Sequence, residues 1–267
     1  MVKKIKFTKM VASGNDFVVV ESLPEGSFLK KLAIEACDRK FGIGADGLLI
    51  LSKAGSGAIR MRIFNSDGSE AQMCGNGARC AALYTGKKNI KIKTLAGIIA
   101  AEVNTGSVKI KLTKPKAAEL DIPLKVNGRG LSVNFINTGV PHAVVFVEGI
   151  AKINVREIGR QVRNNKKFFP AGTNVDFIEV LSKNEVRIRT YERGVEDETL
   201  ACGTGSVAAA LIFALKTGAL NKVNMCTESG EILRVYFKKD ESGFSEVWLE
   251  GKAKIVYRGE YLCLKAQ

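Results

Sequence analysis

The chain has 267 residues, of which 46% are hydrophobic and only 5 are proline. This composition allows two domains of ordinary size and excludes a disordered or low-complexity protein. The formal net charge of +14 suggests a nucleic-acid partner, but the lysines are spread along the chain and no helix-turn-helix, RNP or zinc-finger pattern occurs. We therefore expect a solvated basic surface and no nucleic acid.

The six cysteines contain no Cys-x-x-Cys, and the chain has one histidine, His142. This pattern argues against zinc fingers, a thioredoxin motif and a secreted disulfide framework, and we expect no metal. The start, MVKKIKF, lacks the apolar core of a signal peptide, and the longest apolar run, Val207 to Leu215, is too short to span a bilayer. We expect a soluble, cytoplasmic protein with no membrane partner.

In the first half, residues 4–21 alternate like a strand that is interrupted at Ser13-Gly14-Asn15-Asp16. The interruption is either a bulge that aims Asn15 or a plain hairpin turn. A helix is predicted at about 28–39 and a strand over 58–65, which ends at Asn65. The next expected elements are strands over 89–94, 98–103 and 107–112, followed by a crossover near 114–123.

The second half begins with a strand that ends at Thr138-Gly139-Val140-Pro141-His142. A lone histidine at a strand end is more often structural than catalytic, although its ordinary pKa is near neutrality. The elements expected next are the strand 143–147, a helix at about 154–163, a strand that starts at Asn174, one that ends at Glu192-Arg193, and strands at about 223–238 and 245–257. Residues 260–265 are expected to return to the first unit.

One stretch occurs twice, at an offset of 128 residues. Residues 73–84 read MCGNGARCAALY and residues 201–212 read ACGTGSVAAALI, and Asn65 falls on Arg193 at the same offset. Each copy places a cysteine, Cys74 or Cys202, at the start of a helix whose residues are small or apolar nearly all round, as expected of a helix enclosed by a sheet. The remaining cysteines, by contrast, are expected to be buried small hydrophobes: Cys37, Cys80, Cys226 and Cys263.

The repeat predicts an α/β (α+β) fold of two pseudo-symmetric domains, each a mixed, mostly antiparallel sheet wrapped around a central helix. The expected N-terminal half is 1–117, with about 256–267 returning to it, and the C-terminal half is 118–255.

A cysteine at a helix start is pushed towards thiolate, because unpaired N–H groups and the helix dipole place partial positive charge there. The same N–H groups bind carboxylates. Two such starts facing each other suit removal of a proton from one face of a carbon and return of a proton to the other face. A thiol-disulfide redox protein and a metabolite-binding module without catalysis remain alternatives.

The chain resembles diaminopimelate epimerase in five motifs that occur in the same order: GNDF at 14–17, NSDGSEAQMCGNGARC at 65–80, TGVPHAV at 138–144, AGTNVDF at 171–177 and YERGVEDETLACGTG at 191–205. The resemblance implies an isomerase that needs no pyridoxal phosphate or other cofactor. It would interconvert LL- and meso-2,6-diaminopimelate in lysine and peptidoglycan precursor biosynthesis, as a homodimer. Related proline racemases fit less well, because a histidine usually stands where this chain has Asn76. The phenazine-synthesis relatives lack the cysteine pair.

The resemblance also implies roles for individual residues. Cys74 and Cys202 would be the catalytic acid/base pair, and His142 would sit beside Cys74. Glu192 would meet an ammonium group or support the Cys202 proton. The distal end of the substrate would contact Asn15, Asn65, Asn174 and Arg193, and the reacting carboxylate would contact the backbone of Gly75, Asn76, Gly203 and Thr204. Two positions depart from the family pattern: Val140 stands where many members have Asn, and Gly47 where some have Gln.

Overall fold

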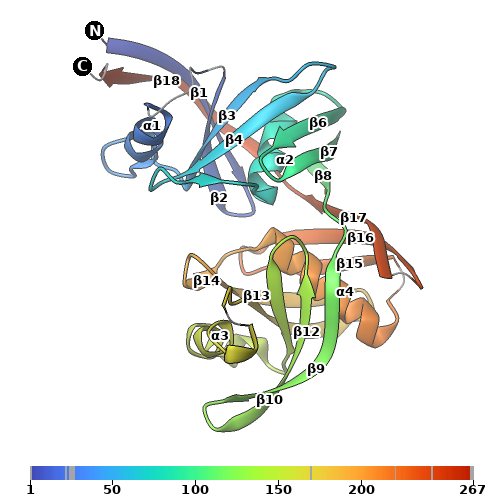
Figure 1. Cartoon of the computed structure of the whole chain (residues 1–267). Helices are drawn as coiled ribbons and strands as arrows, with labels where there is room; N and C mark the ends of the chain where they lie inside the picture. The colour runs from blue at the N-terminus through green and yellow to red at the C-terminus, as the bar shows by residue number, and fades with distance from the viewer. Residues whose placement is uncertain are drawn as a thin grey trace. The chain divides into compact units, whose positions relative to one another are not determined.

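The computed structural model describes residues 2–21, 23, 28–168, 170–219, 221–241 and 243–264. The chain divides into two compact units (Figure 1). Unit 1 comprises Met1–Ile110 and Gly251–Gln267, and unit 2 comprises Lys111–Glu250. Among the described residues, no helix has the length and apolarity needed to cross a bilayer.

Unit 1 is a mostly antiparallel sheet with two helices. Its elements are β1 (Val2–Ala12), β2 (Asn15–Glu21), α1 (Phe28–Cys37), β3 (Gly47–Lys53), β4 (Ile59–Asn65), β5 (Glu70–Ala71), α2 (Gly75–Tyr84), β6 (Asn89–Thr94), β7 (Gly97–Asn104), β8 (Ser107–Lys111) and β18 (Lys254–Leu264). Strand β18 pairs with β1, so the last described residues lie against the first strand (Figure 1). The pairs β2–β3 and β4–β6 are parallel.

Unit 2 contains β9 (Lys116–Val126), β10 (Arg129–Asn137), β11 (Pro141–Phe146), α3 (Val155–Arg163), β12 (Asn174–Ser182), β13 (Glu185–Glu192), β14 (Asp197–Thr199), α4 (Gly203–Thr217), β15 (Lys222–Cys226), β16 (Ile232–Asp240) and β17 (Gly243–Gly251). Two short 3₁₀ helices, Ile150–Lys152 and Lys166–Phe168, flank α3. The parallel pairs are β11–β12 and β13–β15.

The two units repeat one pairing scheme. Strands β1 to β8 correspond to β10 to β17, and β18 beside β1 corresponds to β9 beside β10. The parallel pairs fall at equivalent places, and α1 and α3 each connect the two strands of the first parallel pair. This correspondence confirms the predicted α/β fold of two pseudo-symmetric halves.

The helices α2 and α4 lie inside their sheets. Helix α2 contacts strands on several sides, including β1, β7 and β18, and α4 contacts β10, β12 and β16 among others. Every residue of α4 from Val207 to Ala214 is at most 1% exposed. Small side chains let these helices approach the strands closely. Because strands surround each helix, neither helix shows an exposed polar face.

The structure decides one alternative that the sequence left open and differs from the sequence-based expectations in two details. The interruption at Ser13-Gly14 is a two-residue hairpin turn, since Ala12 pairs with Asn15 and both turn residues have positive φ. Residues 114–123 were expected to form a crossover, but most of them belong to β9, which continues through Pro123 opposite Ser132. The stretch 223–238 is two strands, β15 and β16, that are separated by a turn at Thr227–Gly230.

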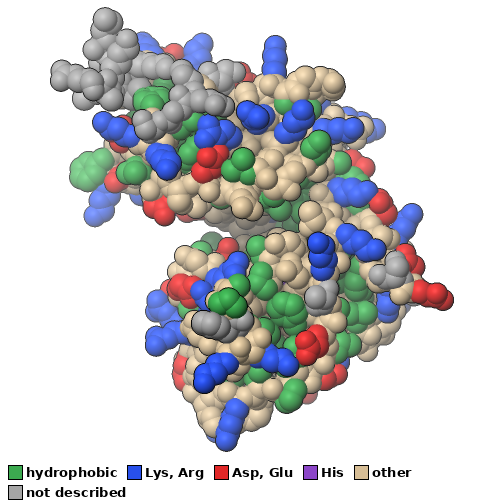
Figure 2. Space-filling view, viewed as in Figure 1, with side chains coloured by type: hydrophobic (Ala, Val, Ile, Leu, Met, Phe, Trp, Pro, Cys, Tyr) green, Lys and Arg blue, Asp and Glu red, His purple; other side chains and the backbone are tan. Residues whose placement is uncertain are grey.

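Charged side chains are spread over the visible surface of both units. Figure 2 shows Lys and Arg scattered among Asp and Glu and not gathered into one continuous basic stripe on the face in view.

Candidate functional site

Each repeated cysteine is the N-cap of its central helix, as the sequence predicted. Cys74 has extended backbone angles (φ −141°, ψ 123°), and its Sγ accepts from the N–H of Gly77 at 3.5 Å. Cys202 does the same for Gly205 at 3.4 Å. The thiols therefore occupy the place that Ser, Thr or Asp usually takes at a helix start. The cysteine sulfur accepts from the third helical N–H group, and the first two helical N–H groups have no intrahelical acceptor.

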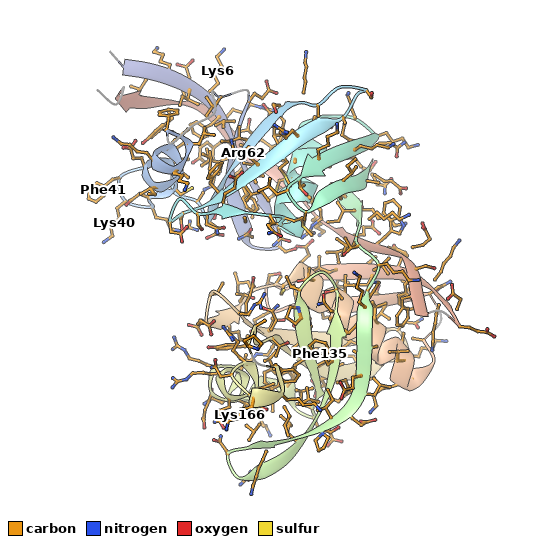
Figure 3. The ribbon with its side chains drawn as sticks, viewed as in Figure 1. Lys6, Lys40, Phe41, Arg62, Phe135 and Lys166 are labelled. Atoms are coloured by element: carbon orange, nitrogen blue, oxygen red, sulfur yellow. The ribbon has the colours of Figure 1, made fainter. Side chains whose placement is uncertain are left out.

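A repeated ion pair fixes the hairpin that leads to each cysteine. Arg62, labelled in Figure 3, donates from Nε and Nη2 to both carboxylate oxygens of Glu70 at 2.6 and 2.8 Å. Arg189 binds Glu198 in the same bidentate way, at 2.7 Å for both bonds. The first pair links β4 to the short strand β5, and the second links β13 to the short strand β14. In each unit the cysteine follows the short strand. These arginines were not predicted as site residues, although their positions, 127 residues apart, are close to the repeat offset.

In unit 1, the amide of Asn15 lies beside Cys74, with Oδ1 at 4.0 Å from Sγ. Asn76 is 8% exposed, and its side-chain oxygen accepts from the fully buried Arg79. Asn65 closes the β4–β5 turn, because its Nδ2 donates to the Ser69 hydroxyl at 2.9 Å. Asn15 and Asn76 thus lie at the start of α2, and Asn65 lies in the turn between the two preceding strands.

In unit 2, a chain of polar contacts runs from Asp176 to Cys202. His142 Nδ1 lies 2.8 Å from Asp176 Oδ2, and His142 Nε2 lies 3.0 Å from the Thr204 hydroxyl. The Thr204 hydroxyl is 3.5 Å from Cys202 Sγ. Asp176 was not predicted as a site residue, although it lies two positions after Asn174 in the AGTNVDF motif. Within its own unit, His142 therefore adjoins the Cys202 end of α4, and its place beside Cys74 stays a prediction.

At Cys202 the helix-start effect that favours thiolate is present but outweighed. Burial raises the pKa of this thiol well above its ordinary value, and the negative charges of Glu192 and Asp176 add to the effect. The N–H of Gly205 donates to the sulfur and opposes the shift but does not overcome it. The thiol form of Cys202 is therefore favoured over the thiolate.

Glu192 and Arg193 follow each other at the end of β13. Burial is the largest influence on Glu192 and raises the pKa of its carboxyl group above the ordinary value. The backbone N–H of Arg193 donates to Asn174 Oδ1 at 2.8 Å, and its guanidinium donates to the carbonyl of Ala171 at 2.9 Å. Asn174 in turn donates to the carbonyl of Pro141 at 3.2 Å, so its amide joins the ends of β11, β12 and β13.

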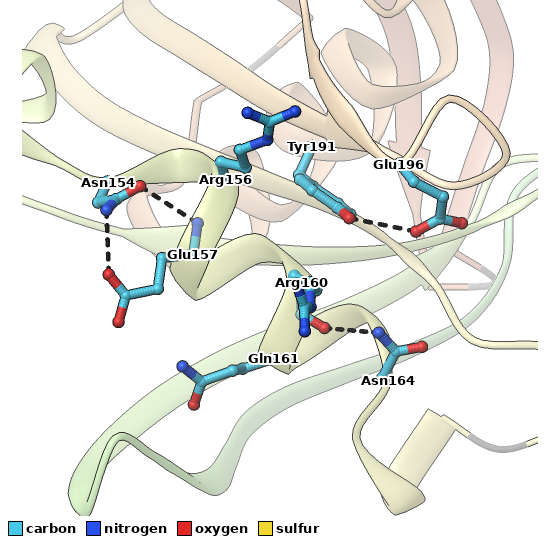
Figure 4. Close-up of a pocket in the computed structure, with 8 residues that line it drawn as sticks. All are labelled: Asn154, Arg156, Glu157, Arg160, Gln161, Asn164, Tyr191 and Glu196. Atoms are coloured by element: carbon cyan, nitrogen blue, oxygen red, sulfur yellow. Dashed lines mark hydrogen bonds between the residues drawn. The ribbon is translucent and has the colours of Figure 1, made fainter.

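The structure gathers the predicted residues within each unit. Unit 1 contains Asn15, Asn65, Cys74, Gly75 and Asn76, and unit 2 contains His142, Asn174, Glu192, Arg193, Cys202, Gly203 and Thr204. A separate pocket of about 780 Å³ follows α3 (Figure 4). None of the predicted site residues lines it.

The other cysteines lie away from these sites. Cys37 and Cys80 are buried among apolar residues, as predicted, and burial raises the pKa of the Cys37 thiol to about 12. Cys226 is only partly buried, and its thiol donates to Glu185 at 3.2 Å, so its prediction as a core residue is wrong. The side chain of Cys263 lies outside the described residues.

Comparison with known proteins assigns the chain to a family. The family model described as "Diaminopimelate epimerase" matches residues 7–118 and 134–256. A diaminopimelate epimerase of Aquifex aeolicus is 43% identical over 96% of this chain and 97% of that protein. Another, from Methanocella arvoryzae, is 41% identical over 96% of both.

Solved structures show the same fold at low sequence identity. A PhzF-family phenazine biosynthesis protein of Bacillus anthracis superposes with a TM-score of 0.74 at 19% identity, covering 97% of this chain and 99% of that one. A probable proline racemase of Agrobacterium radiobacter has a TM-score of 0.68 at 16% identity, covering 96% and 92%. The match to the family model over both units, together with relatives above 40% identity over nearly the whole chain, shows that this protein belongs to the diaminopimelate epimerase family.

Proposed function

We propose that this protein interconverts LL- and meso-2,6-diaminopimelate, a step in lysine and peptidoglycan precursor biosynthesis, by proton transfer between two cysteines and the α-carbon. The observation that carries the proposal is the repeated N-cap thiol, because both members of the pair stand in the same local structure. Membership of the diaminopimelate epimerase family supports the choice of substrate.

One thiolate removes the α-proton and the other thiol supplies a proton from the opposite face. The shifted pKa of Cys202 supports its role as the acid in one direction, since its proton is retained until charge develops on the carbon. In the reverse direction the roles exchange. The helix N–H groups that bind the reacting carboxylate stabilise the negative charge that develops there, in the manner of an oxyanion hole. No cofactor is required.

The remaining residues would bind the substrate. We assign the reacting carboxylate to the N–H groups of Gly75, Asn76, Gly203 and Thr204. The distal amino-acid end would be held by Asn15, Asn65, Asn174 and Arg193, with Glu192 facing an ammonium group and His142 supporting proton transfer.

The departure at Gly47 has a local explanation. A Cβ at this position would come within 2.9 Å of the Phe64 carbonyl oxygen on the paired strand β4. The larger residue that some family members carry would need β3 and β4 to shift. Substrate contacts in this chain would therefore be made without the Gln side chain that some family members have at this position.

We further infer that the protein acts in the cytoplasm as a homodimer, on the resemblance to its family. Light scattering on the purified protein tests the dimer, because a mass near the monomer's 28.9 kDa at assay concentrations would contradict it.

The direct test incubates purified, reduced protein with meso-diaminopimelate and no added cofactor, and follows LL product by chiral chromatography. Proline stereoisomers serve as the comparison substrate. LL-diaminopimelate without proline racemisation supports the proposal, and the reverse result assigns the chain to racemase chemistry. If the reduced wild-type protein binds diaminopimelate without turnover, it is a metabolite-binding module. If it turns over only dithiols, it is a redox protein.

A further inference from the structure

Four charged side chains form a cluster behind Asn15 in unit 1. Lys9 Nζ lies 2.7 Å from Asp16 Oδ2, and its side chain is only 9% exposed. Arg39 Nη2 lies 2.9 Å from Asp16 Oδ1 and 2.7 Å from Asp46 Oδ1. Lys9 also donates to the Gly44 carbonyl. The cluster thus links β1, β2 and the loop between α1 and β3.

The two carboxylates are also fixed by the backbone. The N–H of Asp16 donates to Asp46 Oδ2, and the N–H of Asp46 donates to Asp16 Oδ1, both at 3.0 Å. The loop that carries Arg39 is held by Asp38, whose Oδ1 accepts from the N–H groups of Lys40 and Phe41. The side chains of Lys40 and Phe41 point away from unit 1 (Figure 3), whereas the neighbouring Arg39 reaches Asp16.

The cluster determines how the Asn15 amide is oriented. Asn15 Nδ2 donates to Asp46 Oδ2 at 3.0 Å. An ionised carboxylate only accepts hydrogen bonds, so the NH₂ group must face Asp46 and the amide oxygen must face the other way. That oxygen is the atom 4.0 Å from Cys74 Sγ. The usual ambiguity between amide oxygen and nitrogen is removed here by the partner's charge.

A second cation fixes the same turn from the side of the helix. Arg79 of α2 is fully buried, and its Nη2 donates to the hydroxyl of Ser13 at 2.8 Å and to the side-chain oxygen of Asn76. Ser13 precedes Asn15 in the β1–β2 turn, and Asn76 belongs to the first turn of α2. The turn that carries Asn15 and the helix that begins at Cys74 are therefore held as one piece.

We propose that Asp46, held by Arg39, is a positioning residue that makes Asn15 present a hydrogen-bond acceptor, and not a donor, to Cys74. The inference rests on the proposed function and deepens it. An amide oxygen beside the sulfur favours the protonated thiol, or accepts from an ammonium group of the substrate. An NH₂ group in the same place would favour thiolate and would repel that ammonium group.

Asp46→Asn reverses the amide. Arg39 holds the oxygen of the new side chain, so its NH₂ group faces both Asn15 and the backbone N–H of Asp16, which loses its acceptor. Asn15 must rotate so that its own oxygen accepts, and its NH₂ group then faces Cys74. We expect alkylation of Cys74 by iodoacetamide at pH 7, followed by mass spectrometry of the Cys74 and Cys202 peptides, to become about fivefold faster, the size of one net hydrogen bond. The rate at Cys202 should not change.

The loss of a negative charge alone would also accelerate Cys74, so the decisive comparison is a double-mutant cycle with Asn15→Ala. If Asp46 acts through the amide, Asp46→Asn has no effect on Cys74 in the Asn15→Ala background. An effect that persists there assigns the change to charge and overturns the proposal, as does an equal change at Cys202 or no change at all.

Asp197→Asn is a matched control. Asp197 pairs with Arg156 at 2.7 Å and its side chain is 43% exposed, against 2.7 Å and 40% for Asp46 with Arg39. This variant should leave both alkylation rates unchanged, and thermal unfolding of each variant checks that it is folded. The alkylation assay uses no substrate, so a negative result would not contradict the proposed epimerase activity. If the turnover test failed, the alkylation rates would still show whether Asp46 orients Asn15.

Discussion

His142 Nδ1 lies 2.8 Å from Asp176 Oδ2, and both side chains are completely buried. The second carboxylate oxygen accepts from the Thr190 hydroxyl at 2.7 Å. Because the carboxylate only accepts, the His142 proton must be on Nδ1, which leaves Nε2 to accept from the Thr204 hydroxyl when the ring is neutral. The hydroxyl oxygen of Thr204 is then free to accept from the protonated Cys202.

This tautomer can be observed directly because the chain has one histidine. We expect the ¹⁵N spectrum of histidine-labelled protein to show a protonated Nδ1 and an unprotonated Nε2 at neutral ring charge. Asp176→Asn should keep this pattern, since the new side chain can turn its oxygen to His142 and its NH₂ group to Thr190. Asp176→Leu should lose it. A protonated Nε2 in the wild type would contradict the assignment.

Glu192 should limit stability at neutral pH. Its pKa is raised in the folded protein, so its contribution to folding is fully present below the ordinary value of 4.5 and is lost as pH rises through the folded pKa. At pH 7 the buried charge opposes folding, and Glu192→Gln removes that cost. We expect a higher unfolding temperature for this variant at pH 7, no gain near pH 4, and weaker epimerase activity. Equal gains at both pH values would show that ionisation is not the cause.

Asp16 should show the opposite pH dependence. Burial alone would raise the pKa of its carboxyl group, but hydrogen bonds from Arg39 and Lys9 outweigh burial and hold the pKa well below its usual range. Stability from this group is therefore present above the ordinary value of 3.8 and is lost as pH falls through the folded pKa.

Asp16→Asn leaves the buried Lys9 without its counter-charge. We expect the free energy of unfolding in urea to fall by about 3 kcal/mol at pH 7, the lower end for a broken buried ion pair, and the difference to narrow in acid. Asp67→Asn, which alters an exposed turn carboxylate, is the control. A loss that is the same at pH 7 and in acid would argue against the ion pair.

The repeat offers a matched pair of glycines in the third position of each central helix. A Cβ at Gly205 would lie 2.3 Å from Asp176 Oδ1, an atom that Thr190 holds in place. At Gly77 the nearest atom would be the flexible end of Leu49, at 3.2 Å. We expect Gly205→Ala to reduce the free energy of unfolding by about 3 kcal/mol and Gly77→Ala by less than about 1 kcal/mol. Equal urea midpoints for the two variants would contradict the crowding at Asp176.

The sequence predicted the features that depend on local pattern. Small residues around α2 and α4 indicated enclosed helices, and the Cys-Gly-x-Gly repeat placed both thiols at helix starts. The β9 strand was missed because Pro123 and its polar neighbours resemble a loop, and pairing with β10 outweighs that local preference.

The side-chain networks could not be predicted, because they join residues that are distant in the chain. Arg39 reaches Asp16 across 23 positions, and His142 reaches Asp176 across 34. The raised pKa of Cys202 depends on burial and on carboxylates from two strands of its unit, and these outweigh the helix-start effect that the local sequence suggested. The side-chain networks and the pKa of Cys202 depend on strand register and on side-chain burial, which are known only once the chain is folded.

The measurement that tests the two-thiol mechanism most directly is solvent exchange. Reduced wild type, Cys74→Ala and Cys202→Ala are each incubated with meso-diaminopimelate in deuterated water, and deuterium at the α-carbon is followed together with LL product. We expect the wild type to incorporate deuterium during epimerisation, and both variants to lose net epimerisation. Epimerisation that survives removal of either thiol would contradict the assignment of Cys74 and Cys202 as the acid/base pair.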